Sequence, residues 1–206
     1  DVERSRGLGD VYKRQVYKNT KVDAQMLKDA DVDAVILAIG SSPITIKLEG
    51  MDKLQHASAP EVLRHEVCPK GKVAVIGGGL VGLETADTLA TDGCDVTVLE
   101  MKDEIGSDLG SLRKIAVMMK LQQMQVKMLP NSKVCKFTEE GIVLEDETLV
   151  PCNCAVFAVG FASNDSHLLV EECEKRQIPC RVIGDAKSAR RALDAIAEGF
   201  EAARTL

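Results

Sequence analysis

One segment of this 206-residue chain limits its fold more than any other part of the sequence. A short apolar run, Val73–Ile76, leads directly into the glycine-rich sequence GGGLVG at 77–82, and a helical pattern follows over 80–91. A second strand-like run, Asp95–Leu99, ends directly before the acidic residue Glu100. A strand, a glycine loop, a helix, a strand and a terminal acid in this order predict one half of a doubly wound α/β fold.

The three glycines of the G-x-G-x-x-G pattern in this loop each have a separate physical task. Gly77 allows a tight turn, Gly79 lets the backbone approach a diphosphate, and Gly82 lets the helix pack close to the strand. Glu100, 18 residues after Gly82, would accept hydrogen bonds from an adenosine ribose and repel a 2′-phosphate, so NADH is favoured, with Lys102 leaving NADPH open. The residues predicted to bind NAD(P)H are Gly77, Gly78, Gly79, Leu80, Val81, Gly82 and Glu100.

Short strands and amphipathic helices also alternate outside this segment, which favours an α/β protein with a largely parallel sheet. A stretch without a helical pattern, 126–151, is expected to form a β-meander. Strands are expected at 34–39, 73–76, 95–99, 126–128, 134–137, 141–144, 154–158 and 181–183, and helices at 23–28, 59–66, 80–91, 109–123, 166–175 and 189–204.

Three further strands end in glycine. The first two, ending at Gly40 and Gly160, carry the pattern Ala-x-Gly, and the third ends in Gly184-Asp185. Glycine at a strand exit lets the chain pass close to a neighbouring backbone or cofactor. An aspartate at this position lies where ligands bind in α/β sheets, although Asp185 could equally cap the helix that follows.

The helix expected at 189–204 carries two stripes of apolar residues. The larger residues are expected to face the core, and the small residues are expected to permit close approach on another side. The expected core stripe is Leu193, Ile196, Phe200 and Ala203, and the small-residue stripe is Ala195, Gly199 and Ala202.

Composition and charge exclude several classes of function. The formal net charge is −6 and 3% of residues are aromatic, so neither nucleic acid nor an anionic membrane is an expected partner. The apolar runs are far shorter than the ~20 residues of a membrane span, and no signal peptide is evident. We therefore expect a cytoplasmic protein that binds small molecules.

The cysteines and histidines form no strong metal or catalytic pattern. Cys152 and Cys154 form a C-x-C pair without a second pair or a nearby histidine, which favours reduced structural thiols and leaves a redox pair as the alternative. His56, His65 and His167 are scattered over polar segments and are expected at the surface. We predict no metal site and no catalytic residue in this chain.

Residues 1–15, DVERSRGLGDVYKRQ, do not continue into the pattern that follows. They show no apolar period, and the string DVYKRQ at 10–15 resembles the translation of a transposon-end sequencing adapter. We therefore predict a non-native leader at 1–15, with a natural basic arm as the alternative. On that prediction the gene product continues upstream of residue 16.

Three phrases carry a resemblance to a known family: GGGLVGLETADTLA at 77–90, VTVLEMKDEIGSDLG at 96–110 and VIGDAKSARRALDAIAEGFEAAR at 182–204. They resemble two-dinucleotide-binding flavoprotein reductases, and most closely the NADH:flavin oxidoreductase, 2,4-dienoyl-CoA reductase and enoate reductase family. The resemblance covers residues 16–206. It implies a Rossmann-like NAD(P)H-binding domain inserted in a truncated FAD-binding domain. The implied domains are a partial FAD-binding domain at 16–70, an NAD(P)H-binding domain at 71–154 and a return to the FAD-binding domain at 155–206.

The resemblance also implies roles for residues that match family motifs. Glu84 matches an acid near the contact between nicotinamide and flavin, and Gly160 matches a domain crossing on the NAD(P)H side. For FAD, Gly40 matches the other crossing, and Gly184 with Asp185 matches the motif whose aspartate binds the ribityl chain.

Parts of the family pattern are missing from this sequence. No glycine unit for FAD precedes residue 16, and the cysteine cluster and barrel that would hold an iron–sulfur centre and FMN in the full-length enzyme are absent. The expected partners are therefore a nicotinamide dinucleotide and the missing upstream part of the same polypeptide. We expect 71–154 to fold as a small nucleotide domain, and 16–70 and 155–206 to be poorly stable in isolation.

The implied function is passage of hydride from NAD(P)H to FAD. In the full enzyme this would serve reduction of an activated C=C bond of enoate or dienoyl-CoA type, and the fragment alone is expected to be inactive. Two alternatives stay open. One is another FAD-dependent NADH oxidase or ferredoxin reductase, and the other is a non-catalytic dinucleotide-binding module.

Overall fold

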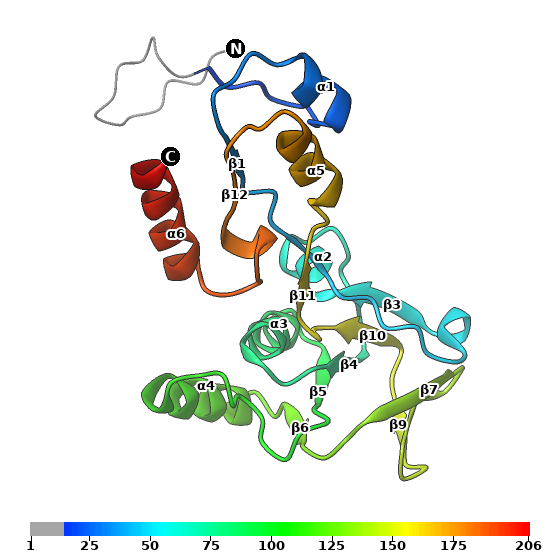
Figure 1. Cartoon of the computed structure of the whole chain (residues 1–206). Helices are drawn as coiled ribbons and strands as arrows, with labels where there is room; N and C mark the ends of the chain where they lie inside the picture. Colours follow the sequence, from blue (N-terminus) through cyan, green and yellow to red (C-terminus); the bar gives the residue numbers. More distant parts are fainter. Residues whose placement is uncertain (1–14) are drawn as a thin grey trace. The chain divides into compact units, whose positions relative to one another are not determined.

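The computed structural model describes residues 15–206, so the predicted leader lies outside the described residues except for Gln15 (Figure 1). The described chain forms two compact units. The first, here called the central unit, contains residues 41–162, and the second, the split unit, contains residues 15–40 and 163–206. Among the described residues, no helix has the length and apolar character to cross a membrane.

The central unit is built on a parallel sheet with the strand order β3–β10–β4–β5–β6. This sheet confirms the predicted α/β class with a Rossmann-like arrangement, in which helices connect neighbouring parallel strands. Its strands are β3 (Gln55–Ser58), β4 (Lys72–Ile76), β5 (Asp95–Leu99), β6 (Lys127–Leu129) and β10 (Cys154–Phe157). Its helices are α2 (Ala59–Leu63), α3 (Leu80–Thr91) and α4 (Ser111–Gln123), with the short 3-10 helix η1 (Met51–Lys53).

Strand alternation divides the core of the central unit between two faces. Val73 and Val75 of β4 pack into one cluster with buried residues of α2, α3 and α4. Ala74 and Ile76 pack into the other cluster, with Phe137 and its neighbours. That second face is covered by an antiparallel sheet of β7 (Val134–Thr138), β8 (Gly141–Leu144) and β9 (Leu149–Pro151). Both faces of the parallel sheet are therefore covered, as buried parallel strands require.

The prediction of a meander over 126–151 was wrong for its first strand. The segment Lys127–Leu129 pairs in parallel with Thr97–Leu99 of β5 and so extends the nucleotide-type sheet. The chain reaches this position through α4, which is the crossover that a parallel pair needs. Only the part from Val134 onward forms antiparallel pairs.

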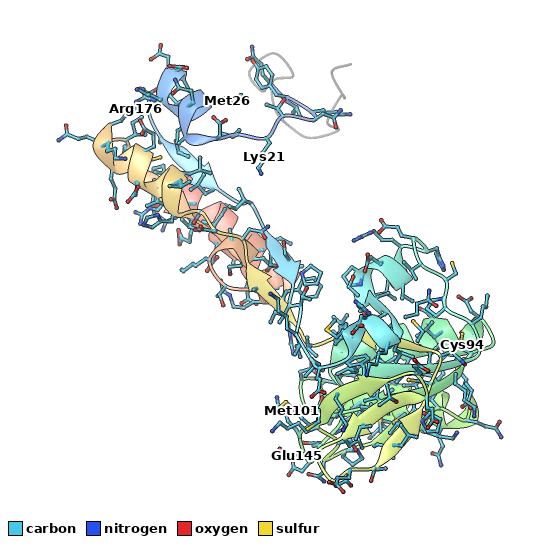
Figure 2. The ribbon with its side chains drawn as sticks, turned by 90° about the vertical axis from the view of Figure 1, so that its right-hand side faces the viewer. Lys21, Met26, Cys94, Met101, Glu145 and Arg176 are labelled. Atoms are coloured by element: carbon cyan, nitrogen blue, oxygen red, sulfur yellow. The ribbon has the colours of Figure 1, made fainter. Side chains whose placement is uncertain are left out.

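The split unit has a much smaller sheet. Its strands β1 (Val35–Leu37) and β12 (Cys180–Val182) pair in parallel. Arg176, which follows α5, donates hydrogen bonds to the carbonyl oxygens of Leu27 and Ala30 and so ties α5 to the end of α1 (Figure 2). The helices are α1 (Ala24–Asp29), α5 (His167–Lys175) and α6 (Ala192–Thr205), with η2 (Gly184–Ala186) after β12. Two short strands, β2 (Ser41–Pro43) and β11 (Phe161–Ser163), pair beside the places where the chain passes between the units.

The two stripes of α6 have different surroundings. The prediction that the large apolar stripe faces a core was wrong for the described residues, because Leu193, Ile196 and Phe200 are 77%, 70% and 71% exposed. Ala203, the fourth member, is also exposed. The small-residue side is the packed one: an ideal Cβ on Gly184 would lie 3.3 Å from Ala195 Cβ. Close approach on the small side is therefore confirmed, and the large residues lack a partner within the described chain.

Candidate dinucleotide site

The glycine loop follows β4 in a conformation that only glycine adopts easily. Gly77 has a φ of +111°, and an ideal Cβ there would lie 2.4 Å from the carbonyl oxygen of Ala158. An ideal Cβ on Gly82 would lie 1.9 Å from the carbonyl oxygen of Gly77, so α3 packs directly against the turn. The tight turn and the close helix contact are the two tasks expected of the first and last glycines.

Glu100 supports this loop from the end of β5. The residue is 9% exposed, and its Oε2 accepts a hydrogen bond of 2.7 Å from the amide N–H of Gly78. Its Oε1 accepts a hydrogen bond of 2.9 Å from the amide of Lys102. Each carboxylate oxygen has further acceptor capacity, so Glu100 can hold the loop and still accept from a sugar hydroxyl.

The N-terminus of α3 is in contact with a second carboxylate. The helix begins after Gly79, which has no side chain to cap it. Both oxygens of Asp108 lie close to the amide nitrogen of Leu80, at 3.1 and 3.0 Å. The first helical amides and the positive end of the helix dipole thus bind an anionic group here.

These elements surround a cavity of about 500 Å³ at the carboxyl ends of β4 and β5. Of the predicted residues, Gly77, Gly79, Leu80, Val81, Glu100 and Gly160 line it. Gly78 and Gly82 lie behind this surface, where they bond to Glu100 and contact the Gly77 carbonyl. The space, the open backbone and the buried acid fit a nicotinamide dinucleotide, and the position matches the ligand site of open α/β sheets.

The rim of the cavity contains residues that sequence reasoning had not assigned to a site. Met101 is 67% exposed, and its side chain is labelled in Figure 2. Lys133, another residue of the lining, pairs with Glu145 at 2.7 Å, and this contact raises the pKa of the lysine. The rim therefore combines an apolar side chain with charged groups. No local sequence signal identifies these residues, because Lys133 comes from the loop before β7 and Met101 from the loop after β5.

Glu84 lies outside this lining. Its Oε1 accepts a hydrogen bond of 2.8 Å from Arg113 of α4, and both side chains are largely exposed. The predicted role of Glu84 near a nicotinamide stays a prediction.

The predicted FAD residues of the split unit lie together. Gly40, Gly184 and Asp185 line one cavity of about 380 Å³, although they are far apart in the sequence. Asp185 accepts a hydrogen bond of 3.2 Å from the amide of Arg190. A cavity with a carboxylate in its wall fits the part of a flavin dinucleotide that carries hydroxyl groups, because a carboxylate accepts hydrogen bonds from hydroxyls.

Glu198 of α6, which was not predicted, bonds to two residues that line this second cavity, Gly184 and Arg190. Its Oε2 accepts a hydrogen bond of 2.7 Å from the amide of Gly184, and its Oε1 accepts from Arg190 and from Lys187. The Arg190 hydrogen bond, followed by that from Gly184, lowers the pKa of Glu198 to about 2. The carboxylate is therefore ionised throughout the neutral range and fixes the turn that presents Asp185.

The two neighbouring cysteines have surroundings that suppress thiolate chemistry. Burial raises the pKa of Cys152 and of Cys154 to about 11 in each case. Because the thiolate is the reactive form, this environment favours structural thiols over a redox pair.

Known proteins are similar to this chain over most of its length. A family model described as pyridine nucleotide-disulphide oxidoreductase matches residues 6–185. The chain is 36% identical over 191 residues to bilirubin reductase of Mediterraneibacter gnavus, covering 89% of this chain and 29% of that protein. It is 34% identical over 200 residues to cinnamate reductase of Clostridium sporogenes, covering 93% of this chain and 29% of that protein.

A solved structure shows the same fold. The complex of 2-naphthoyl-CoA reductase with 2-naphthoyl-CoA superposes with a TM-score of 0.80 at 24% sequence identity, covering 91% of this chain and 29% of that one. This chain thus spans about three tenths of the length of each of these three proteins.

Proposed function

The chain belongs to the pyridine nucleotide-disulphide oxidoreductase family, whose members are FAD-dependent NAD(P)H oxidoreductases, and on this premise we propose that its central unit binds NADH for reduction of FAD. The observation that carries the proposal is the cavity under the glycine loop, lined by Gly77, Leu80 and Glu100. It combines helix amides for a diphosphate with a buried acid for a ribose.

The chain's own residues bind and orient the dinucleotide. The amides at the start of α3, at Leu80 and Val81, would bind the diphosphate, and Glu100 would accept from the adenosine ribose. An anionic side chain at that ribose favours NADH over NADPH. Bound NADH supplies a hydride that FAD accepts, and the protein contributes orientation and exclusion of water. Glu84 and Gly160 are proposed to lie toward the nicotinamide end.

The split unit is proposed to supply part of the FAD site through Gly40, Gly184 and Asp185. We keep the domain proposal of 16–70 and 155–206 for FAD and 71–154 for NAD(P)H. The compact central unit is larger than the proposed NAD(P)H-binding domain, because it also contains residues 41–70 and 155–162. The exposed stripe of α6 supports completion of the FAD domain by further chain of the same polypeptide, because the matched relatives are about three times longer.

For the whole enzyme we propose reduction of an activated C=C bond. Cinnamate reductase is one of the similar proteins, and its name denotes an acid with such a bond. FMN and an iron–sulfur centre, if the full-length enzyme uses them, would be bound outside this chain. An NADH oxidase or a ferredoxin reductase is the alternative within the same fold, and a non-catalytic dinucleotide module is the alternative in another class.

The first experiment is titration of the 206-residue chain with NADH and with NADPH, followed by nicotinamide fluorescence. Saturable binding of NADH, tighter than that of NADPH, is the expected result. In Gly79→Val a branched side chain would stand in the cavity beside Asp108, and NADH binding should fall by more than tenfold. Gly110→Val is the matched control, because an ideal Cβ there meets no atom within 4 Å. A folded wild-type chain without saturable NADH binding would contradict the proposal.

The second experiment tests the acceptor with the longer protein. Under anaerobic conditions, NADH oxidation that depends on added cinnamate or another α,β-unsaturated acid supports C=C reduction. Oxidation that requires molecular oxygen favours the NADH oxidase alternative, and oxidation that requires a ferredoxin favours the ferredoxin reductase. Binding of NADH without oxidation under any of these conditions would favour the non-catalytic module.

A further inference from the structure

Asp108 provides the cap that α3 lacks in its own sequence. The N-cap residue is Gly79, and the cap comes from a residue 28 positions away, through hydrogen bonds of 3.1 and 3.0 Å from the Leu80 amide. An ideal Cβ on Gly79 would lie 3.2 Å from Asp108 Oδ2, so the carboxylate also lies directly over the glycine loop. A negative charge at this position is stabilised by the positive end of the helix dipole.

In the proposed function, the diphosphate of the dinucleotide binds at the same helix start. Leu80, Gly79 and Asp108 all line the cavity. A dinucleotide diphosphate binds to helix N-terminal amides for the same electrostatic reason that a carboxylate does. Two anionic groups that use the same amides within a few ångströms repel each other and compete.

Asp108 lies on a short, exposed loop beside the start of α3. The loop runs between two glycines, Gly106 and Gly110, and its Asp108 side chain is exposed. Gly106 has a φ of +68°, and its amide donates a 2.7 Å hydrogen bond to the carbonyl oxygen of Gly78, which anchors one end of the loop. An ideal Cβ on Gly110 meets no atom within 4 Å, so no neighbouring group crowds the other end of the loop.

We propose that Asp108 is an internal anionic competitor that lowers the affinity of the central unit for the diphosphate of a dinucleotide. The inference rests on the proposed function for the identity of that ligand. It assigns Asp108 a role in setting affinity in addition to capping. Without ligand, the Leu80 amide at the start of the helix donates its hydrogen bond to Asp108. The diphosphate must displace the Asp108 carboxylate in order to bind this amide.

Asp108→Asn separates charge from hydrogen bonding. Asparagine keeps a side-chain oxygen that can accept from the Leu80 amide and is an equally good capping residue, but it has no negative charge. We expect the variant to bind NADH on the order of tenfold more tightly than wild type at about 0.05 M salt. The difference should shrink at about 0.5 M salt, because added ions screen the repulsion. If Asp108 only caps the helix, neither the gain in NADH affinity nor its dependence on salt is expected.

A control variant and a second ligand distinguish a failure of this inference from a failure of the proposed function. Asp92→Asn removes the same charge at the opposite end of α3, where Asp92 is the C-cap, and should leave NADH binding unchanged. Asp108→Ser is the second neutral variant, should Asp108→Asn fail to fold. Inorganic pyrophosphate tests the anion site without a nicotinamide, and it should raise the melting temperature of Asp108→Asn more than that of wild type.

Equal or weaker NADH binding by both neutral variants would overturn the inference and leave the proposed function standing. Absence of NADH binding in wild type and variants, together with stronger pyrophosphate binding by Asp108→Asn, would overturn the proposed function and support the competition. Absence of binding of either probe to any of these folded proteins would overturn both.

Discussion

Strands β4 and β10 of the central unit bury almost every side chain, whereas β1 and β12 of the split unit leave several partly or fully exposed. The two sheets differ in how completely other elements of the chain cover their faces. In the central unit, helices cover one face of the parallel sheet and β7–β9 cover the other. In the split unit, among the described residues, β1 pairs with β12 and with no other strand. Both units show the sequence pattern of α/β folding, but only the central one contains a core covered on both sides.

The difference matters because short parallel sheets are weak when their edges and faces are open. The apolar side chains that could cover the split unit are present, since α6 carries Leu193, Ile196 and Phe200, but these residues face solvent. A unit of this kind gains stability when a partner buries such a stripe. The comparison therefore predicts that stability is concentrated in the central unit.

Amide hydrogen exchange should show the largest effect. Strands β4 and β10 are expected to exchange through global unfolding of the central unit, and β1 and β12 through local opening. For a typical domain stability this gives the central strands about a thousandfold more protection. Exchange measured by mass spectrometry on the 206-residue chain would check the ratio. Equal protection in the two sets of strands would show that the split unit has a full core of its own.

A matched pair of leucine substitutions tests the same contrast at single side chains. Leu83 of α3 is 0% exposed and Leu193 of α6 is 77% exposed. Leu83→Ala should lower the free energy of unfolding by about 3 kcal/mol through lost burial and a cavity. Leu193→Ala should change it by less than about 0.5 kcal/mol, because the side chain is already in water. Urea denaturation of both variants provides the measurement.

The result for Leu193 should reverse in a longer protein that contains a complete FAD-binding domain. There, Leu193→Ala is expected to cost about 2–5 kcal/mol, as for other buried leucines. A small effect in both settings would remove the support that the exposed stripe gives to completion by upstream chain.

Where local pattern and tertiary environment agree, the sequence was a good guide. Both α3 and β5 begin and end where the glycine loop and the apolar alternation predicted. Strand β3 was not predicted, because Gln55–Ser58 is short and partly polar, and it is defined by parallel pairing with β10. The stripe of α6 was recognised as apolar, but periodicity cannot tell whether the surface that buries it belongs to the same chain.

The same limit applies to the candidate sites. The glycines and Glu100 were predictable, since their tasks depend on neighbours in the sequence and on strand order. Asp108 caps a helix that begins 28 residues earlier, and Glu198 bonds to an amide 14 residues earlier. Such contacts depend on how loops and helices pack, so no spacing rule reveals them.

Glycine substitutions should have a smaller but still clear effect. An alanine Cβ at Gly82 would lie 1.9 Å from the Gly77 carbonyl oxygen, so α3 must move away from the turn. We expect Gly82→Ala to lower the free energy of unfolding by about 2 kcal/mol through overpacking, and to weaken NADH binding. Gly110→Ala, which meets open space, should cost less than about 1 kcal/mol. Similar urea midpoints for the two variants would show that the close helix contact is not required.

The smallest expected effect belongs to Glu198, which supports the split unit through the Gly184 amide and Arg190. Its pKa in the folded chain is about 2, below the ordinary glutamate value of 4.5, mainly because of the Arg190 hydrogen bond. The ionised form therefore stabilises the folded state above the ordinary value, and this contribution is lost as the pH falls toward 2. Glu198→Gln should lower the melting temperature by a few degrees at neutral pH. Its melting temperature should also fall less than that of wild type as the pH is lowered, which makes the acid limb of the stability curve flatter.

Glu201→Gln is the matched control on the same helix, because Glu201 is largely exposed and pairs with Arg204, three residues further along the helix. It should leave the acid limb as in wild type, since exposed pairs of this kind contribute little. Melting curves at several pH values, followed by circular dichroism, would compare the three proteins. If Glu198→Gln and wild type lose stability in parallel on acidification, Glu198 does not hold the turn. The presentation of Asp185 would then depend on Arg190 and the backbone of η2 alone.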